Sequence, residues 1–442
     1  MPIDRQTSWV PLRWPSAWKD AAILELLAGT PVNCVLFGAG ADPALRSAAG
    51  KAGLATVDWS RPQDSGVAAA PLAKLSWTSP YPVFAVTDAA WPGVRPRQRG
   101  SRDDADSGPT GAPWVDANGW VAGLVRARAP HKAIWLASDP PAKNVNLPRP
   151  EAYLLALADA AAGGARWPLA LDEEFARDLA AHRPESLAQW KLIATALAFF
   201  ESHPAWAAYE TRAALAVISS FSGTSEYLGA EILNLAARRN LAYRVMEKTR
   251  AAAADFGGLK AILYVDASPP VEPLRKKLEA FVLSGGLLIA PSPATLKMSG
   301  GQPVETGVAG YQVRAFEKGR IATPVKAWED PYQVAADAHS LVSRRNDPVR
   351  LFNAGMVSCR CSVALSGGTT LLELVNYSAR APAHAITVAL EAAVVSARVS
   401  TLENPAPARI EPVRSKHGVE LPLPPFAVWA AVELNPKEGS HA

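Results

Sequence analysis

The chain has 442 residues, 49% of them hydrophobic, which predicts two or three domains rather than one core. Its 45 Lys and Arg residues against 41 Asp and Glu give a net charge of +4 without a basic stripe, which argues against a nucleic-acid partner. The three cysteines make no disulfide framework and the seven histidines are scattered, so neither a metal nor another cofactor is expected. No apolar run is long enough to span a membrane.

The N-terminal sequence leaves the compartment of the protein open. The stretch MPIDRQTSWVPLRWPSAW lacks the apolar segment of an intact signal peptide, which fits a cytoplasmic protein. A leader that had been removed and replaced by a start codon would leave the same sequence, and the protein would then be periplasmic or secreted.

Short apolar runs alternate with helical patterns over residues 1–211. Strands are predicted over 32–38, 54–59, 82–88, 132–139 and 166–172, and helices over 116–130, 150–165 and 186–204. Repeated β-then-α units indicate a parallel sheet, and no nucleotide-binding fingerprint accompanies them. We therefore expect a TIM-like β/α barrel. Because the segment falls short of the roughly 250 residues of a full barrel, an incomplete barrel is also considered.

A second α/β unit is predicted over 212–335. Its strands fall within 213–223, 241–248, 258–266 and 285–291, and its helices within 225–240 and 270–286. This is the pattern of a compact, flavodoxin-like doubly wound domain. From about residue 345 the period changes, with strands predicted over 369–378, 384–395, 408–415 and 426–434. Pro- and Gly-rich turns separate them, which indicates a small C-terminal β-sandwich over 345–435.

Residues 258–291 carry the most specific pattern, in which the strand KAILYVD is followed by LRKKLEAFVLSGGLLIAP. Together with the order of the three domains, this helix-to-strand element resembles the β-galactosidases that have a trimerisation domain, and related barrel glycoside hydrolases. Their middle domain is similar to class I glutamine amidotransferases. The resemblance implies an amidotransferase-like fold for 212–335 and a homo-oligomer, dimer or trimer, formed through 212–320.

The sequence departs from these families at the residues that carry their chemistry. An amidotransferase needs a nucleophilic cysteine at a strand-to-helix turn, and the corresponding turn here, SFSGTSEYLG, has none. Barrel glycosidases of this kind have an Asn-Glu pair after the fourth strand, whereas the fourth clear strand here ends in LASDPP. Amidotransferase activity is therefore not expected, and the glycosidase residues cannot be transferred by motif.

Aspartates stand at the C-terminal ends of four of the predicted strands, where barrel active sites form. They are Asp58, Asp88, Asp139 and Asp172. Glycoside hydrolysis needs two carboxyl groups, and we take Asp88, Asp139 and Asp172 as candidate catalytic residues. Asp88 lies near Trp91, and two glutamates follow Asp172. Two of these candidates have a structural alternative: Asp139 precedes a Pro-Pro turn, and Asp172 suits the N-cap of a helix over 173–181.

The segment GPTGAPWVDANGW, residues 108–120, follows a charged run over 95–106 that we expect to be a solvated loop. Glycine-rich loops at strand ends often carry binding sites. Trp91, Trp114, Asp116 and Asn118 are therefore candidate substrate-binding residues. Alternatively, Asp116 or Asn118 caps the following helix, and Trp114 and Trp120 pack it against the barrel.

These features predict a carbohydrate-active hydrolase that cleaves a glycosidic bond in a small-molecule or oligosaccharide substrate by carboxylate acid/base catalysis. The missing Asn-Glu pair favours the alternative, a non-catalytic carbohydrate-binding or assembly protein with a degenerate glycosidase barrel. A barrel hydrolase that acts on non-sugar substrates is a third reading, so whether the chain is an enzyme stays open.

Overall fold

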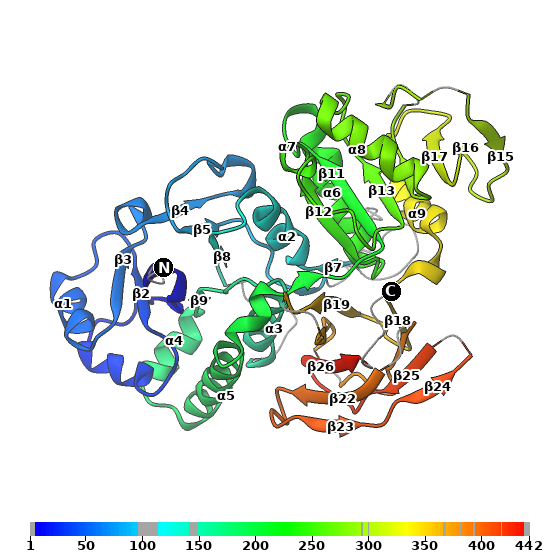
Figure 1. The fold of residues 1–442 in the computed structure, drawn as a ribbon. Coiled ribbons are helices and arrows are strands. Elements are labelled where there is room, and N and C mark those ends of the chain that lie inside the picture. Colours follow the sequence, from blue (N-terminus) through cyan, green and yellow to red (C-terminus); the bar gives the residue numbers. More distant parts are fainter. Residues whose placement is uncertain are drawn as a thin grey trace, which may run out of the picture.

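The computed structural model describes residues 5–95, 114–140, 149–292, 295–298, 300–365, 368–379, 382–391, 394–416 and 418–436. The chain is a mixed α/β protein, as the sequence predicts. Figure 1 shows three groups of elements: an N-terminal group in blue to green, a sheet with helices in green to yellow, and antiparallel sheets in orange to red. The loop predicted over 95–106, apart from its first residue, and the beginning of the segment 108–120 lie outside the described residues.

Seven short parallel strands form the frame of the N-terminal group among the described residues. They are β1 (Pro11–Arg13), β2 (Cys34–Phe37), β3 (Ala55–Asp58), β4 (Val67–Ala70), β5 (Val83–Val86), β8 (Ala133–Leu136) and β9 (Leu169–Ala170). They lie in the orders β3-β2-β1-β9 and β4-β5-β8, and a bridge between Trp135 and Arg166 joins β8 to the segment before β9. Strand neighbours are thus chain neighbours and β9 returns to β1, which is the strand order of a β/α barrel. Within the described residues β3 and β4 do not pair.

Buried side chains alternate between two cores along these strands. One core consists of strand residues alone: Cys34, Leu36, Val57, Val67, Val83, Ala85 and Trp135. The intervening residues pack against the helices and include Val35, Phe37, Phe84, Val86, Ile134 and Leu136. Because successive side chains of a strand point to opposite faces, the first core fills the inside of the strand array and the second lies outside it.

Several of the connections between these strands are short. Its α-helices are α1 (Pro43–Lys51), α2 (Gly119–Arg128), α3 (Glu151–Ala162), α4 (Glu173–Ala180) and α5 (Pro184–Glu201). Single 3-10 helices stand between β1 and β2, β3 and β4, and β4 and β5: η2 (Ala21–Leu27), η3 (Pro62–Ser65) and η4 (Leu72–Lys74). An antiparallel pair of two-residue strands, β6 (Gly93–Val94) and β7 (Val115–Asp116), precedes α2.

The second group is a seven-stranded sheet with helices on its faces. In sheet order its strands are β12 (Tyr243–Glu247), β11 (Leu215–Ser219), β13 (Ala261–Tyr264), β14 (Leu287–Ile289), β17 (Gly319–Pro324), β16 (Tyr311–Phe316) and β15 (Gln302–Val304). The helices are α6 (Glu226–Arg238), α7 (Lys248–Ala251), α8 (Glu272–Leu283) and α9 (Pro331–Val342). The first five of these strands are parallel. Numbered among themselves by their order along the chain, they lie in the order 2-1-3-4-5, which is the order of flavodoxin-like sheets.

Helix α2 lies between the first two groups. Its Val121, Ala122 and Val125 belong to the outer core of the strand array. Its Leu124 belongs instead to the core of the second group, and α2 contacts both β12 and α6. This double packing places the start of α2, and the loop before it, at the junction of the two groups (Figure 1).

Two antiparallel sheets form the C-terminal group. The first contains β10 (Glu210–Thr211), β19 (Val357–Val363), β20 (Thr370–Asn376), β26 (Trp429–Pro436), β22 (Val394–Thr401) and β23 (Ala408–Ile410). The second contains β18 (Val349–Phe352), β21 (Thr387–Leu390), β25 (Gly418–Pro422) and β24 (Val413–Ser415). Residues of both sheets share one core, among them Leu372 and Val432 of the first and Val388 and Leu421 of the second.

The single strand predicted over 408–415 is wrong. The structure has two strands there, β23 and β24, and they belong to different sheets. Pro412 separates them, and a proline cannot donate a backbone hydrogen bond to a neighbouring strand.

Candidate functional site

Asp88 follows β5 and connects the ends of two neighbouring strands. Its Oδ1 accepts a hydrogen bond from the backbone N–H of Leu72, which lies just beyond β4, at 2.8 Å. Within the part of the chain that the structure describes, the second carboxylate oxygen has no protein partner. That oxygen can therefore accept a hydrogen bond from a ligand.

Asn118 holds the loop that carries Asp88. It stands at the N-cap position of α2 but makes no capping bond, and it is 1% exposed. Its Oδ1 accepts from the N–H of Ala90 at 2.9 Å, and its Nδ2 donates to the carbonyl of Ala90 at 2.8 Å. The side chain thus pairs with Ala90 as a neighbouring strand would. This geometry favours a positioning role for Asn118 over the predicted contact with a substrate.

A buried carboxylate holds Asn118 from its other side. Asp159 of α3 accepts hydrogen bonds from the backbone N–H of Asn118 at 3.0 Å, from Nδ2 of Asn118 at 2.8 Å and from the hydroxyl of Tyr377 at 2.6 Å. Burial raises the pKa of Asp159, while the hydrogen bonds from Tyr377 and Asn118 act to lower it. Tyr377 follows β20, so these bonds connect the loop after β5 to the C-terminal sheets.

Charged and aromatic side chains cluster around the paired strands β6 and β7. Asp116 accepts from Nε of Arg95 at 2.7 Å. The guanidinium of Arg238, from α6, lies over the ring of Trp114 at 3.3 Å from the ring centre. Its Nε donates to Oδ1 of Asn234 at 3.2 Å. Burial lowers the pKa of Arg238 to about 10, an effect that the charge of Asp116 opposes. One face of Trp114 is therefore covered by a cation rather than open to a sugar.

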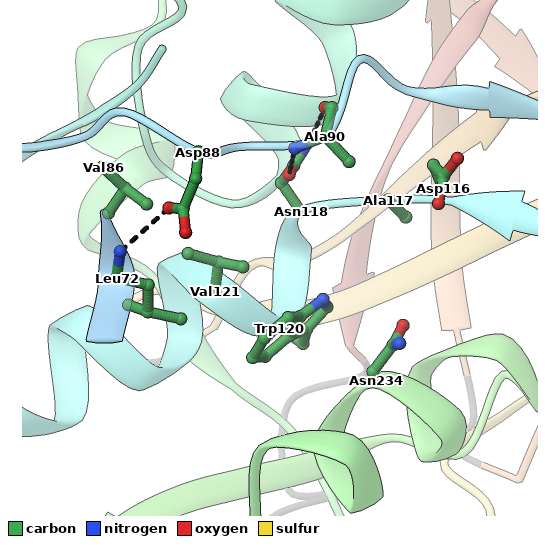
Figure 2. A pocket seen from close by; sticks show the side chains of 10 residues that line it. All are labelled: Leu72, Val86, Asp88, Ala90, Asp116, Ala117, Asn118, Trp120, Val121 and Asn234. Atoms are coloured by element: carbon green, nitrogen blue, oxygen red, sulfur yellow. Dashed lines mark hydrogen bonds between the residues drawn. The ribbon is translucent and has the colours of Figure 1, made fainter. Parts of the chain in front are cut away.

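These elements enclose a pocket of about 160 Å³, which we call the junction pocket. Its lining comprises Leu72, Val86, Asp88, Ala90, Asp116, Ala117, Asn118, Trp120, Val121 and Asn234. Figure 2 shows Leu72 and Asp88 on one side of the Trp120 ring and Asn234, from α6 of the second group, on the other. The structure thus brings together three predicted site residues: Asp88, Asp116 and Asn118.

Asp139 and Asp172 do not line the junction pocket. Asp139 pairs with Nη1 of Arg13 at 2.5 Å, and its side chain is 81% exposed. Asp172 accepts the N–H of Phe175 at 2.9 Å, which confirms the alternative prediction that it caps α4. Asp172 also lies 3.3 Å from Nε of Arg149. Each of these carboxylates is therefore engaged by neighbouring protein groups.

Trp91 is also outside the lining of the junction pocket. Its ring packs edge-on against Tyr153 and Trp167, with centroid distances of 5.6 and 5.3 Å. The hydroxyl of Tyr153 donates to Asp172 at 2.9 Å. Trp91 and Asp172 therefore belong to one aromatic and polar cluster near α3 and α4, where Trp91 has a packing role.

Strand alternation explains why the predicted catalytic aspartates do not converge. In β5, Val83 and Ala85 face the inner core, so Asp88 falls on the outer face, toward α2. In β8, Trp135 faces the inner core, and the same alternation directs Asp139 toward the inside, at the end of the strand array. Strand-end position alone does not show this difference.

Among the lining residues that were not predicted as site residues, Trp120 and Asn234 have the side chains best suited to contact a sugar. Trp120 lies in the segment 108–120 and was expected only to pack against the barrel, so its place in that loop was the available signal. Asn234 lies on α6, and nothing in the local sequence EILNLAARRN marks it as a site residue.

Among the described residues no group of three His, Cys, Asp or Glu is placed to bind a metal ion. No described helix has the length and apolar character that crossing a membrane requires.

Comparison with known proteins gives likenesses of structure only. No model of a known protein family matches the sequence, and no curated protein matches it either. Among solved structures, a β-galactosidase from Bacillus circulans sp. alkalophilus matches with a TM-score of 0.49 and 10% identity over 90% of this chain and 63% of that one. An α-L-fucosidase from Paenibacillus thiaminolyticus matches with a TM-score of 0.46 and 14% identity, over 70% of this chain and 61% of that one. A β-galactosidase from Halorubrum lacusprofundi matches with a TM-score of 0.40 and 14% identity, over 92% of this chain and 64% of that one.

The chain thus spans about three fifths of the length of each of these structures. They include β-galactosidases, the class that the sequence resembles. Because these identities and TM-scores are low, a proposal about function has to be argued from the geometry of the junction pocket.

Proposed function

We propose that this chain is a carbohydrate-active protein that binds a sugar unit in the junction pocket. The lining combines a hydrogen-bond acceptor, a donor and an aromatic ring. The second carboxylate oxygen of Asp88 accepts, and Nδ2 of Asn234, which has no partner within the described residues, donates. The ring of Trp120 lies between them (Figure 2). This combination supports the proposal, because sugar hydroxyls both donate and accept and sugar ring faces stack on aromatic rings.

The size of the junction pocket supports a single sugar unit. Typical sites for drug-sized ligands have roughly 300–1,000 Å³. A cavity of roughly 150 Å³ holds a benzene molecule. A pyranose with its hydroxyl groups is larger, so the volume of about 160 Å³ fits only part of one terminal sugar unit, with the rest of the glycan outside the pocket.

The proposed architecture has three domains. A degenerate TIM-like barrel covers residues 1–211, an amidotransferase-like unit 212–335, and a β-sandwich 345–435. Three features support it: the strand order of the first group, the 2-1-3-4-5 order of the second, and the shared core of the two C-terminal sheets. In this arrangement the sugar site lies between the barrel and the second unit.

A glycan array followed by saturation-transfer NMR with the free monosaccharides that score tests this proposal. We expect selective binding by a small set of glycans and saturation transfer to the protons of one terminal sugar ring. The Trp120→Phe variant should bind more weakly, since it keeps an aromatic ring but reduces the stacking surface. The absence of binding on the array and in NMR at millimolar sugar would refute the proposal.

Hydrolysis of a glycosidic bond is the second candidate function. It is favoured by the presence of two carboxyl groups, Asp88 and Asp116, in one pocket, since retaining and inverting glycosidases both use such a pair. In this case Asp88 is one catalytic carboxylate and Asp116 its partner. Asp139 and Asp172 are less suited, because neither lines the junction pocket.

A panel of aryl glycosides distinguishes the two functions. Turnover that is lost in Asp88→Asn and kept in Asp139→Asn and Asp172→Asn would establish hydrolysis at the junction pocket. Binding without turnover by the wild-type protein would establish the binding function alone.

A further inference from the structure

We infer that Asp159 is the positioning residue of the junction pocket: through Asn118 it fixes the loop that carries Asp88, and through Tyr377 it ties this loop to the C-terminal sheets. The role of this pocket in sugar binding rests on the proposed function. The hydrogen-bonded connection itself does not, and it can be tested without a ligand.

The first step runs from Asp159 to Asn118. Asp159 is 2% exposed and accepts two hydrogen bonds from Asn118, one from the backbone and one from the side chain. An amide side chain has two donors and one acceptor oxygen, and its orientation follows the partners that it finds. The carboxylate accepts only, so it requires Nδ2 of Asn118 on its side and directs Oδ1 away from itself.

The second step runs from Asn118 to the loop after β5. With Nδ2 near Asp159, Oδ1 is directed at the N–H of Ala90, and Nδ2 also reaches the carbonyl of Ala90. Ala90 lies two residues beyond Asp88 and lines the same pocket (Figure 2). A different orientation of the Asn118 amide would leave the half-buried N–H and carbonyl of Ala90 without these bonds, which is unfavourable. The orientation of the Asn118 amide therefore determines the position of this loop.

The third step runs from Asp159 to the C-terminal group. The Tyr377 hydroxyl donates to Oδ1 of Asp159 at 2.6 Å, and Tyr377 is 5% exposed. Tyr377 is itself anchored beside β20, where its N–H donates to the carbonyl of Met356 at 3.1 Å. The Asp88 loop is therefore held by a group that lies outside the N-terminal strand array.

Hydrogen exchange measured by mass spectrometry on the full chain tests the connection, in a peptide that covers residues 87–92. Asp159→Asn keeps the shape but replaces an accepting oxygen with a donor. Tyr377→Phe removes one donor from the far side of Asp159 and touches neither Asn118 nor Ala90. We expect both variants to speed exchange of the Ala90 amide by about tenfold, as the loss of roughly 1.4 kcal/mol of local protection would do.

The matched control is Asp347→Asn. Asp347 is also a buried carboxylate, bonded to His339 at 3.0 Å, but it lies beyond α9 in another part of the chain. This variant should lower stability without changing exchange at Ala90. Unchanged exchange at Ala90 in both Asp159→Asn and Tyr377→Phe would overturn the inference, as would equal acceleration in the control. If these results hold but no sugar binds to the wild-type protein, the proposed function fails while the positioning role of Asp159 stands.

Discussion

At the residue scale, burial determines what the charged groups at the contact between the N-terminal and C-terminal groups can do. Glu373 of β20 is 2% exposed and lies 3.5 Å from Nη1 of Arg360. The guanidiniums of Arg360 and Arg126 donate to backbone carbonyls at the end of α3, those of Ala162 and Gly164 among them. Burial raises the pKa of Glu373 to about 7, although the two arginines lower it. The loss of solvation outweighs the attraction of the two cations.

The raised pKa of Glu373 predicts a pH-dependent stability. Its folded-state pKa of about 7 exceeds the ordinary value of 4.5, so its contribution is fully present below about pH 4.5 and is lost as the pH rises through about 7. A shift of this size corresponds to about 3 kcal/mol. We expect the free energy of unfolding of Glu373→Gln, relative to wild type, to increase by up to that amount from pH 4.5 to pH 8. Urea unfolding at both pH values measures this change.

The control for this prediction is Glu403→Gln, which replaces a glutamate whose carboxylate accepts an exposed backbone hydrogen bond from Ala427. Its stability relative to wild type should change little over the same pH range. A Glu373→Gln variant whose stability follows the wild-type curve at every pH would contradict the assignment.

At the element scale, hydrophobic patterns located most of the strands and helices that frame the site. β2, β5 and β8 are continuous apolar runs, and such runs are typical of buried parallel strands. β1 and β4 were missed for physical reasons: β1 is three residues that begin with proline, and three of the four residues of β4 are alanine, a poor strand former. Their pairing comes from the neighbouring strands rather than from their own sequence.

The candidate site could be predicted only in part. The strand-end rule and the segment 108–120 led to Asp88, Asp116 and Asn118, which line one pocket. The rule could not separate Asp139 from Asp88, because it ignores which face of the strand each side chain takes. Asn234 and Asp159 come from helices far along the chain, and their contribution depends on how the groups pack together.

Helix α4 offers a direct test of an element boundary. Asp172 caps it through the N–H of Phe175, and asparagine is as good an N-cap as aspartate, whereas alanine is not. We expect Asp172→Ala to lower the free energy of unfolding by about 1–2 kcal/mol, and Asp172→Asn to cost less than half of that. Denaturant titration of both variants measures the difference. Equal losses would show that the ion pair with Arg149, rather than the cap, is the stabilising contact.

At the scale of the whole molecule, the junction pocket depends on all three groups of elements. The N-terminal group supplies Asp88 and Trp120, the second group supplies Asn234, and the C-terminal group holds Asp159 through Tyr377. Helix α2 packs into the cores of the first two groups. A ligand in this pocket therefore contacts two groups at once, and we expect its binding to stabilise their packing.

The resemblance in sequence also predicts an assembly. We expect residues 212–320 to form a homo-oligomer, dimer or trimer, as the resemblance to trimerisation domains implies. Sedimentation velocity at micromolar concentration should then give a mass of two or three chains. A strict monomer at concentrations up to roughly 50 µM, where an interface with a micromolar Kd would be largely formed, would contradict the prediction.

Calorimetric titration of the best-binding glycan from the array tests the central claim, sugar binding at Asp88, most directly. The comparison is between wild type, Asp88→Asn and Asp58→Asn. Asp58 is the matched control, because it stands at the end of β3 in the same group of strands but is held by Arg46 and Ser60 outside the junction pocket. We predict that Asp88→Asn weakens binding about tenfold or more, the usual effect of losing a charge-assisted hydrogen bond, and that Asp58→Asn leaves the Kd unchanged. Equal affinities in wild type and Asp88→Asn, or an equal loss in both variants, would contradict the account.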